Sequence, residues 1–476
     1  MLVGCGPHAK RIYVPLFRKY KNRINICCVV DIKEKEEETT NFLQSLNCKT
    51  HFIEKKHLTS DKLHPSVEKK LNEFVKQYNI QGVVISTEPL THVMYSKWAL
   101  KNNLSILLDK PVSTYPNVST KANLAKKILI DYDDLAKIYR KKPNVSFSLM
   151  SQRRFHPAFR RIRHLIHECY KQTNCPVTSI QSFHCDGQWR MPTEIVDQMY
   201  HPYCQGYGKG SHSGYHFFDI VPFLIGPGYA KNKAYDEVTA YSTVVRPLDF
   251  LQQINFKDYE KLFGKEQFNF HNKYSEKECG KIMKNFGEMD VFTNLELKRN
   301  NQTITLASIN LAHNGFAQRD WITAKGRDLY KGNGRVRQET HIIQQGPFQA
   351  VHYHSYQSKE VDPKKKSKLC GVGGEYHSEI YIFRNEKVIG GKNFERVIVP
   401  NLNKIILKDK SRGHQEDARA KGFLEFIEFL EGKRKREEMT SDFLTHRMGS
   451  LITSLVYQSI VSQYNNKNAK VGMKVK

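Results

Sequence analysis

The feature that most constrains the fold of this chain is a regular alternation of strand-like and helix-like stretches over its first 145 residues. Four apolar runs read as strands: INICCVVDI (24–32), NIQGVVISTEP (79–89), LSILLDKP (104–111) and PNVSFSLMSQ (143–152). Strands buried on both faces are apolar throughout, and their alternation with helices predicts a parallel, doubly wound sheet. We expect an α/β domain of this kind over residues 1–150.

A glycine-rich loop opens the chain. Gly4-Cys5-Gly6-Pro7-His8-Ala9 fits the pattern G-x-G-x-x-G/A. In that pattern the first glycine permits a tight turn, the second lets a pyrophosphate approach the backbone, and the last small residue lets helix and sheet pack closely. Amides at the start of the next helix then bind the anion. The loop therefore predicts a dinucleotide site formed by Gly4, Gly6, Pro7, His8 and Ala9, although an ordinary turn could carry the same residues.

An acidic residue at the end of the second strand supports the dinucleotide interpretation. Asp31 follows Gly6 by 25 residues, the spacing at which an acidic side chain accepts hydrogen bonds from the adenosine ribose. A carboxylate there would repel a 2′-phosphate, so the sequence predicts NAD as the cofactor. Lys33 stands two residues further on and could offset the repulsion, which leaves NADP open.

Only Met1, Leu2 and Val3 precede the loop. A typical strand runs about five residues. We therefore expect either that the true start lies upstream or that the first strand is frayed.

The chain changes character after residue 175. Five strand-like runs joined by turns indicate a large, mostly antiparallel sheet: 177–189, 236–246, 290–299, 302–314 and 319–326. The sequence thus predicts a second α/β domain over residues 151–476.

Three further segments differ from these strand-like runs in their sequence pattern. Residues 253–284 interrupt the strand series and indicate an insertion. Residues 415–463 read as two helices, and residues 464–476 as a polar, lysine-rich tail.

The composition limits the class of protein. The chain has 75 Lys and Arg against 48 Asp and Glu, a formal charge of +27 that would attract nucleic acid or an anionic substrate. The basic runs are short, so a charge spread over the surface explains it equally well. We see no signal peptide and no apolar run that could span a membrane, and expect a cytoplasmic location. The ten cysteines include no CxxC pair, so neither a metal site nor a disulfide framework is expected.

Polar residues stand at the carboxyl ends of the strand-like runs at 79–89 and 104–111. Thr87, Pro89 and His92 come at or just after the end of one run, and Asp109 and Lys110 at the end of the other. Open α/β sheets bind ligands at the carboxyl ends of their strands, which favours a place near the cofactor for all five. A lone lysine is otherwise most often a solvated one.

A glycine-rich approach to an apolar helix stands in the second half, GYGKGSHSGYHFFDIVPFL (206–224). His216 and Asp219 are three residues apart and would share a helix face. A histidine can accept a proton from an alcohol near neutral pH. In isolation, a capping or core histidine is the simpler interpretation.

Taken together, these motifs resemble the Gfo/Idh/MocA family of NAD(P)-dependent oxidoreductases. The family's E-K-P corresponds to Asp109-Lys110-Pro111, and its T-P–H segment to Thr87-Glu88-Pro89 with His92. Its R-x-x-P corresponds to Arg154-Phe155-His156-Pro157, and its D-x-G-x-H-x-x-D to the segment from His212 to Asp219.

The resemblance implies a Rossmann domain followed by a sheet-based substrate domain, with the active site in the cleft between them. It implies that Lys110 stabilises the reacting oxygen, that His216 accepts the proton, and that hydride passes to or from the nicotinamide. Substrate contacts would come from Arg154, His212 and Asp219. Substrates would be sugars, cyclitols or their derivatives, and homo-oligomers would form through the C-terminal sheet.

Two positions depart from the family pattern. Asp109 replaces a glutamate and keeps its charge, whereas His212 replaces an aspartate that usually helps to bind substrate. The basic charge would suit an anionic substrate. Two alternatives stay open: a non-catalytic cofactor-binding regulator of the same fold, and a nucleic-acid-binding protein. The retention of Lys110 and His216 speaks against the first, and the absence of a basic motif interleaved with aromatics against the second.

Overall fold

A computed structural model describes residues 1–475 apart from 45, 59–61, 230–232, 320–333, 359–363, 365, 366 and 400–413. The chain divides into two compact units. The first unit comprises residues 1–115, 127–156 and 415–451, and the second comprises residues 116–126, 157–414 and 452–476.

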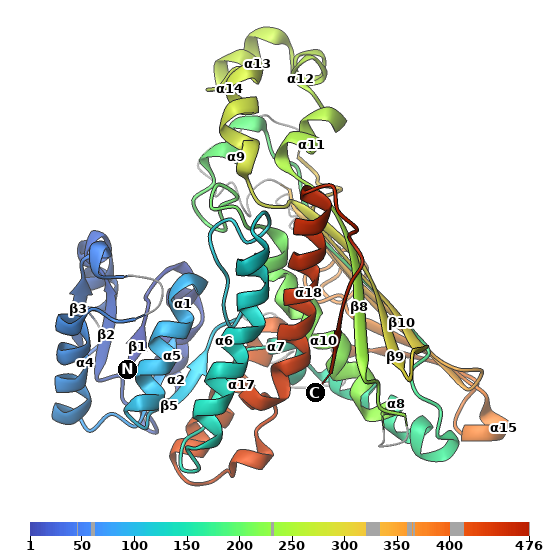
Figure 1. Cartoon of the computed structure of the whole chain (residues 1–476), viewed down its shortest axis with the longest axis horizontal. Helices are drawn as coiled ribbons and strands as arrows, with labels where there is room; N and C mark the ends of the chain where they lie inside the picture. Colours follow the sequence, from blue (N-terminus) through green and yellow to red (C-terminus); the bar gives the residue numbers. More distant parts are fainter. Residues whose placement is uncertain are drawn as a thin grey trace. The chain divides into compact units, whose positions relative to one another are not determined.

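The first unit is built on a six-stranded sheet (Figure 1). Its strand order is β3-β2-β1-β4-β5-β6, and every pair is parallel, so the predicted doubly wound sheet is confirmed. The strands are β1 (Leu2–Val3), β2 (Cys28–Ile32), β3 (Lys49–Ile53), β4 (Gly82–Ile85), β5 (Ser105–Leu108) and β6 (Phe147–Leu149). The helices are α1 (Pro7–Arg11), α2 (Tyr13–Lys19), α3 (Glu36–Leu43), α4 (Pro65–Gln77), α5 (His92–Lys101) and α6 (Ala122–Arg140), the last belonging to this unit from residue 127 onward.

The first strand is short but it is not frayed. Leu2 and Val3 pair with β2 on one side and with β4 on the other. Their side chains are 0% and 1% exposed. Because both neighbouring strands supply ladder partners and the helices cover both faces, two residues suffice to hold β1 in the sheet.

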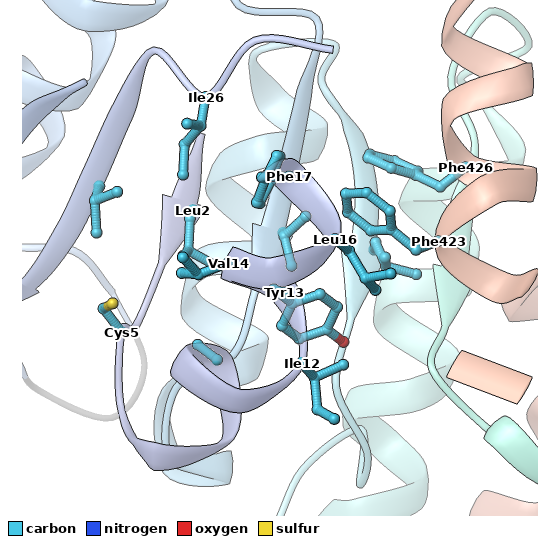
Figure 2. Packing of buried hydrophobic residues seen from close by; sticks show 14 of the residues in the cluster. Leu2, Cys5, Ile12, Tyr13, Val14, Leu16, Phe17, Ile26, Phe423 and Phe426 are labelled. Carbon is cyan, nitrogen blue, oxygen red and sulfur yellow. The ribbon is translucent and has the colours of Figure 1, made fainter. Parts of the chain in front are cut away.

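A helix from the C-terminal part of the chain belongs to this first unit. In α17 (His414–Leu430), Phe423 and Phe426 enter the same buried core as Tyr13 and Phe17 (Figure 2). The ring centroids of Phe17 and Phe423 lie 5.1 Å apart, edge to face. The first unit is therefore not one continuous stretch of chain that ends near residue 150, because an apolar helix face from residues 415–430 completes its core.

The second unit is built on a nine-stranded sheet in the order β14-β13-β12-β11-β7-β10-β9-β8-β15. Only β7 and β10 pair in parallel, so the prediction of a mostly antiparallel sheet is confirmed. The strands are β7 (Ser179–Gln188), β8 (Glu237–Val245), β9 (Asp290–Arg299), β10 (Gln302–Asn314), β11 (Val336–Gln345), β12 (Gln349–Ser358), β13 (Glu379–Arg384), β14 (Phe394–Ile398) and β15 (Val471–Lys474).

The principal helices of this unit are α8 (Pro157–Thr173), α10 (Tyr215–Ile225) and α18 (Arg447–Tyr464), the last from residue 452 onward. Three short helices lie in the segment 253–284, predicted to be an insertion: α12 (Phe256–Phe263), α13 (Lys265–His271) and α14 (Glu276–Ile282). A fourth, α11 (Pro247–Gln253), leads into it. They bury a small core of their own around Tyr259, Phe268 and Cys279.

One predicted segment differs from its expectation, and another lies almost wholly outside the described residues. The predicted polar tail at 464–476 contains β15, which pairs with β8 at the edge of the large sheet. Its alternating Val471 and Met473 are too few to reveal a strand in the sequence. The strand-like run at 319–326 lies outside the described residues except for Arg319.

Candidate functional site

The glycine loop has the geometry that a dinucleotide requires. Gly4 has φ +87°, and a Cβ there would lie 2.6 Å from the carbonyl oxygen of Ser86, so only glycine fits. Gly6 differs, because a Cβ there would meet nothing closer than Lys35 Nζ at 3.8 Å. The backbone at Gly6 thus borders open space at the start of α1, where Pro7 takes the first helical position. That open side suits a diphosphate seated on the loop.

Asp31 braces this loop from the end of β2. Its carboxylate accepts a hydrogen bond from the backbone N–H of Cys5 at 3.2 Å and another from the hydroxyl of Thr39 at 3.2 Å. Lys33, which could have offset its charge, forms an ion pair with Glu36 instead. The end of β2 beside the loop therefore presents a carboxylate, and the lysine nearest to it in sequence is paired with Glu36.

Asp109, at the end of β5, ties together three parts of the first unit. It accepts hydrogen bonds from the hydroxyls of Tyr13 and Ser86, each at 2.6 Å, and its carboxylate lies 3.6 Å from the ring of His8. Burial alone would raise the pKa of Asp109, but His8 and the two hydroxyl donors hold it below its usual range. The acidic residue of the family pattern thus braces the glycine loop and the start of the Lys110 segment.

His92 connects the loops that follow β4 and β5. Its Nδ1 lies 2.7 Å from the carbonyl oxygen of Pro111, and its Nε2 lies 3.1 Å from that of Thr87. Burial lowers the pKa of His92, against the effect of these two carbonyl contacts. The peptide bond between Lys110 and Pro111 is cis. His92, one of the predicted cofactor residues, therefore holds the backbone of Thr87 and the loop that contains Lys110 in place.

Pro89 begins a short turn, Pro89–Thr91, directly after Thr87. The hydroxyl of Thr91 donates to that of Thr87 at 2.8 Å. Between them stands Glu88, which sequence reasoning missed. Burial raises the pKa of Glu88, while the positive charges of Lys35 and Lys110 oppose that shift. Lys110, the predicted catalytic lysine, is thus close enough to Glu88 to act on the pKa of its carboxyl group.

Arg154, a predicted substrate residue, lies in the first unit. Its guanidinium donates to the hydroxyl of Thr445 at 2.5 Å and to the carbonyl oxygen of the same residue at 3.1 Å. These bonds tie the short helix α7 (Gln152–Phe155) to the C-terminal segment of the unit.

The other predicted substrate and catalytic residues lie in the second unit. His212 stands in a π-helical turn, Gly210–Gly214, and His216 and Asp219 follow in α10. All three side chains are buried. The ring of His212 stacks on that of His201, with centroids 4.7 Å apart and an interplanar angle of 10°. The turn and the helix thus bring the predicted residues to one end of α10.

The glycines before His212 pack against Glu288. A Cβ at Gly208 would lie 1.8 Å from the carbonyl oxygen of Glu288. The Glu288 carboxylate accepts the backbone N–H groups of Gly208 and Gly210, each at 3.1 Å, and the hydroxyl of Tyr457 at 2.8 Å. Burial raises the pKa of Glu288. Glu288, which the sequence did not single out, therefore fixes the turn that carries His212.

Replacing Glu288 tests this bracing. We expect Glu288→Ala to lower the free energy of unfolding by roughly 2–4 kcal/mol, because three buried donors lose their acceptor. Glu288→Gln keeps an acceptor oxygen and should lose clearly less. Urea denaturation of both variants measures the difference, and equal losses in the two would contradict the bracing role.

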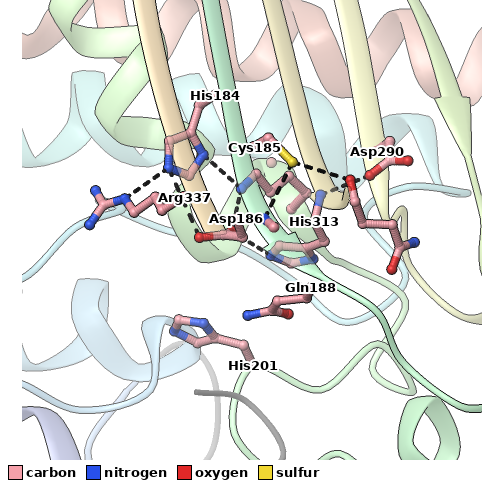
Figure 3. A network of polar contacts seen from close by, with 12 residues as sticks. His184, Cys185, Asp186, Gln188, His201, Asp290, His313 and Arg337 are labelled. Carbon is pink, nitrogen blue, oxygen red and sulfur yellow. Dashed lines mark hydrogen bonds and ion pairs between the residues drawn. The ribbon is translucent and has the colours of Figure 1, made fainter. Parts of the chain in front are cut away.

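A buried charge network surrounds Asp186 at the end of β7 (Figure 3). Lys209 donates to Asp186 at 2.5 Å and lies 3.0 Å from Nδ1 of His184. His313 Nε2 lies 3.4 Å from Asp186, and Arg335 also forms an ion pair with this carboxylate. Burial lowers the pKa of Lys209, while Asp186 opposes that shift. This network was not predicted from the sequence, although three polar or ionisable residues in a row within a strand, His184-Cys185-Asp186, could have indicated it.

The burial of His8 predicts that acid destabilises the protein. Burial, opposed by Asp109, lowers the pKa of His8 from 6.5 to about 4. The unfolded chain therefore binds a proton at His8 at a higher pH than the folded chain does. The free energy of unfolding should fall by up to roughly 3 kcal/mol as the pH drops from about 6.5 to about 4. The lowered pKa of Asp109 adds a loss of the same sign at lower pH.

Denaturation over this pH range, with His8→Gln as the matched variant, measures the effect. The variant should lose less stability on acidification than the wild type. The same pH dependence in both proteins would exclude His8 as its source.

Two surveys of the described residues bear on metals and membranes. No group of three or more His, Cys, Asp or Glu side chains among them is arranged to hold a metal ion. None of the helices that the structure describes is long and apolar enough to cross a membrane.

No family model and no curated protein sequence matches the chain. Solved structures do match it along nearly its whole length. A NAD-binding oxidoreductase from Klebsiella pneumoniae is 13% identical with a TM-score of 0.57, the match covering 100% of this chain and 98% of that one. An oxidoreductase from Agrobacterium radiobacter, in complex with NAD+, L-tartaric acid and magnesium, is 9% identical with a TM-score of 0.56, covering 99% and 97%.

A myo-inositol dehydrogenase from Corynebacterium glutamicum is 11% identical with a TM-score of 0.51, the match covering 100% of this chain and 98% of that one. At such identities the likeness concerns the fold. The match extends over nearly the full length of both chains. The chain therefore shares its fold with these NAD-binding oxidoreductases and inositol dehydrogenases.

Proposed function

We propose that this protein is an NAD(P)-dependent oxidoreductase that transfers hydride between the nicotinamide and a CH–OH or keto carbon of a sugar, a cyclitol or a sugar derivative. The observation that carries the proposal is the loop at Gly4 and Gly6. One glycine is required by its backbone, the other borders open space, and Asp31 stands at the adenosine side. This arrangement fits a dinucleotide, whose nicotinamide would supply the hydride chemistry.

The protein's own contribution would come from two residues. Lys110 follows β5 and would place its ammonium where negative charge develops on the substrate oxygen. His216, near the start of α10, would take or return the proton of the hydroxyl. Asp109 and His92 would hold the Lys110 loop, and Glu288 the turn before His216, so that both groups keep their geometry.

NAD should bind more tightly than NADP. Asp31 would accept from the ribose hydroxyls and repel a 2′-phosphate, and the pairing of Lys33 with Glu36 leaves that repulsion in place. Calorimetric titration with NADH and NADPH measures the preference. Asp31→Asn keeps an acceptor for the Cys5 N–H but removes the charge, so it should narrow the difference. Tighter binding of NADPH by the wild type would overturn this assignment.

The substrate is proposed to carry negative charge. His212 stands where the family pattern has an aspartate, and the chain has a formal charge of +27. The neighbour with bound L-tartaric acid, an acidic polyol, supports the same class. We expect His212→Asp to weaken binding of acidic sugars and to favour neutral polyols. Binding isotherms for a matched sugar and sugar acid test this, and unchanged preference in the variant would contradict it.

The second candidate is a cofactor-binding regulator without turnover, favoured by the exchange at His212. It would bind NADH as the enzyme does, but no sugar would be oxidised or reduced. A homo-oligomer through the large sheet, a cytoplasmic location and the absence of nucleic-acid binding also stay predictions.

A further inference from the structure

Helix α17 carries a buried arginine next to the glycine loop. Two contacts fix the register of this helix in the first unit: the ring of Phe423 against Tyr13 and Phe17, and a pair of hydrogen bonds from Arg23 to Glu431 at 2.8 and 2.6 Å. Arg419 precedes Phe423 by one helical turn and so lies on the same face. It is 7% exposed. Arg419 is thus buried on the face of α17 that packs against Tyr13 and Phe17.

Arg419 lies among charged groups of both signs. Its guanidinium is close enough to His8 and Tyr13 to lower the pKa of each. Arg11, of the same sign, also acts on both Arg419 and His8. On the negative side stand Asp109, already bonded to two hydroxyls, and Glu416, whose carboxylate is 3.4 Å from Arg419. Two guanidinium groups, those of Arg419 and Arg11, thus lie near the loop, and one of the two carboxylates beside them, Asp109, is already bonded to the hydroxyls of Tyr13 and Ser86.

The order of the strands in the sheet indicates which half of a bound dinucleotide would lie near the Arg419 guanidinium. β2, with Asp31 at its end, lies on one side of β1, whereas β4 and β5 lie on the other. A dinucleotide crosses the end of β1, so its adenosine lies toward β2 and its nicotinamide toward β5. Arg419 acts on Asp109 at the end of β5 and on His8 in the loop, and so belongs to the nicotinamide half.

We propose that Arg419 is a cofactor-binding residue whose guanidinium binds the phosphate on the nicotinamide side of the dinucleotide's diphosphate. A planar guanidinium offers two parallel donors to a phosphate, which a lysine cannot match. The inference rests on the proposed function, since it needs a dinucleotide on the loop. The inference adds to the cofactor site a residue of α17, a helix far from the glycine loop in sequence.

The test compares three probes on the full-length protein. NADH and ADP-ribose contain the phosphate that Arg419 would bind, whereas 5′-AMP contains only the adenosine-side phosphate. We expect Arg419→Gln to raise the Kd of NADH and ADP-ribose by about 10- to 100-fold, the loss of a charge-assisted hydrogen bond, and to leave that of 5′-AMP nearly unchanged. Arg419→Lys keeps the charge without the fork and should fall between the two.

Arg23→Gln is the matched control. It removes the contact with Glu431 that secures α17 but leaves the charge at the loop, so all three affinities should stay close to the wild type. An equal loss for 5′-AMP and NADH in Arg419→Gln, or the same loss in Arg23→Gln, would mean that the residue only supports the fold and would overturn the inference.

Unchanged NADH binding in Arg419→Gln would overturn it as well. Failure of the wild type to bind NADH is a different result, because it would refute the proposed function itself. If Arg419→Gln does not fold, the ratio of NADH to 5′-AMP affinity in Arg419→Lys decides: a ratio equal to that of the wild type contradicts a phosphate contact.

Discussion

Lys110→Ala should lower turnover by at least roughly 10²-fold on any substrate that the wild type converts, while NADH binding survives. The ammonium would stabilise charge that develops only during the reaction, so its loss should reduce kcat more than it raises KM. The glycine loop and Asp31, which would hold the cofactor, make their own contacts and do not depend on the Lys110 side chain. His216→Ala should show a loss of similar size for the proton-transfer role.

The control is a conservative variant. His216→Gln keeps a hydrogen-bonding side chain but cannot take up the proton, so it should remain as slow as His216→Ala. Steady-state kinetics with NADH binding measured in parallel separates the two functions. Near-wild-type turnover in Lys110→Ala would remove this mechanism and leave the regulator as the better interpretation.

Gly4→Ala should lower the stability of the protein, whereas Gly6→Ala should lower its affinity for the cofactor and leave stability nearly unchanged. At Gly4 a methyl group would sit 2.6 Å from the Ser86 carbonyl oxygen on a backbone with φ +87°. The free energy of unfolding should fall by roughly 1–3 kcal/mol or more, and cofactor binding with it. At Gly6 the methyl group meets no protein atom closer than 3.8 Å, so the free energy of unfolding should change little. The methyl group would, however, occupy the space in which the diphosphate is proposed to bind.

Thermal denaturation and NADH titration of both variants read out the two effects. The informative result is a stable Gly6→Ala protein that no longer binds NADH. If Gly6→Ala binds as the wild type does, the open space at this loop is not a phosphate site.

The nucleotide-binding half could be predicted because its signals are local. Gly4 is required by its own backbone conformation and one neighbouring carbonyl, and Asp31 by the end of its strand. The strand-like runs at 24–32 and 79–89 are apolar because the sheet buries them on both faces. Such features leave a pattern within a few residues, and the structure reproduces that pattern.

The rest depends on contacts between distant parts of the chain. Glu288 looks like any acidic residue before a strand until Gly208 and Gly210 pack against it from about 80 positions away. Arg419 looks like an ordinary helical arginine until Phe423 docks on Tyr13. Of the two alternatives expected for β1, an upstream start or a frayed strand, the structure does not show the frayed strand, because β2 and β4, which are distant in sequence, pair with it on both sides.

The central claim is that the protein transfers hydride between a nicotinamide cofactor and a sugar-like alcohol. The most direct measurement incubates the wild type and Lys110→Ala with NAD+ and a panel of sugars, cyclitols and their acid and phosphate derivatives, and with NADH and the matching keto compounds, and follows NADH. We predict that at least one compound is converted by the wild type and that Lys110→Ala converts it at least roughly 10²-fold more slowly. A wild type that binds NADH but converts no compound in either direction would contradict the claim.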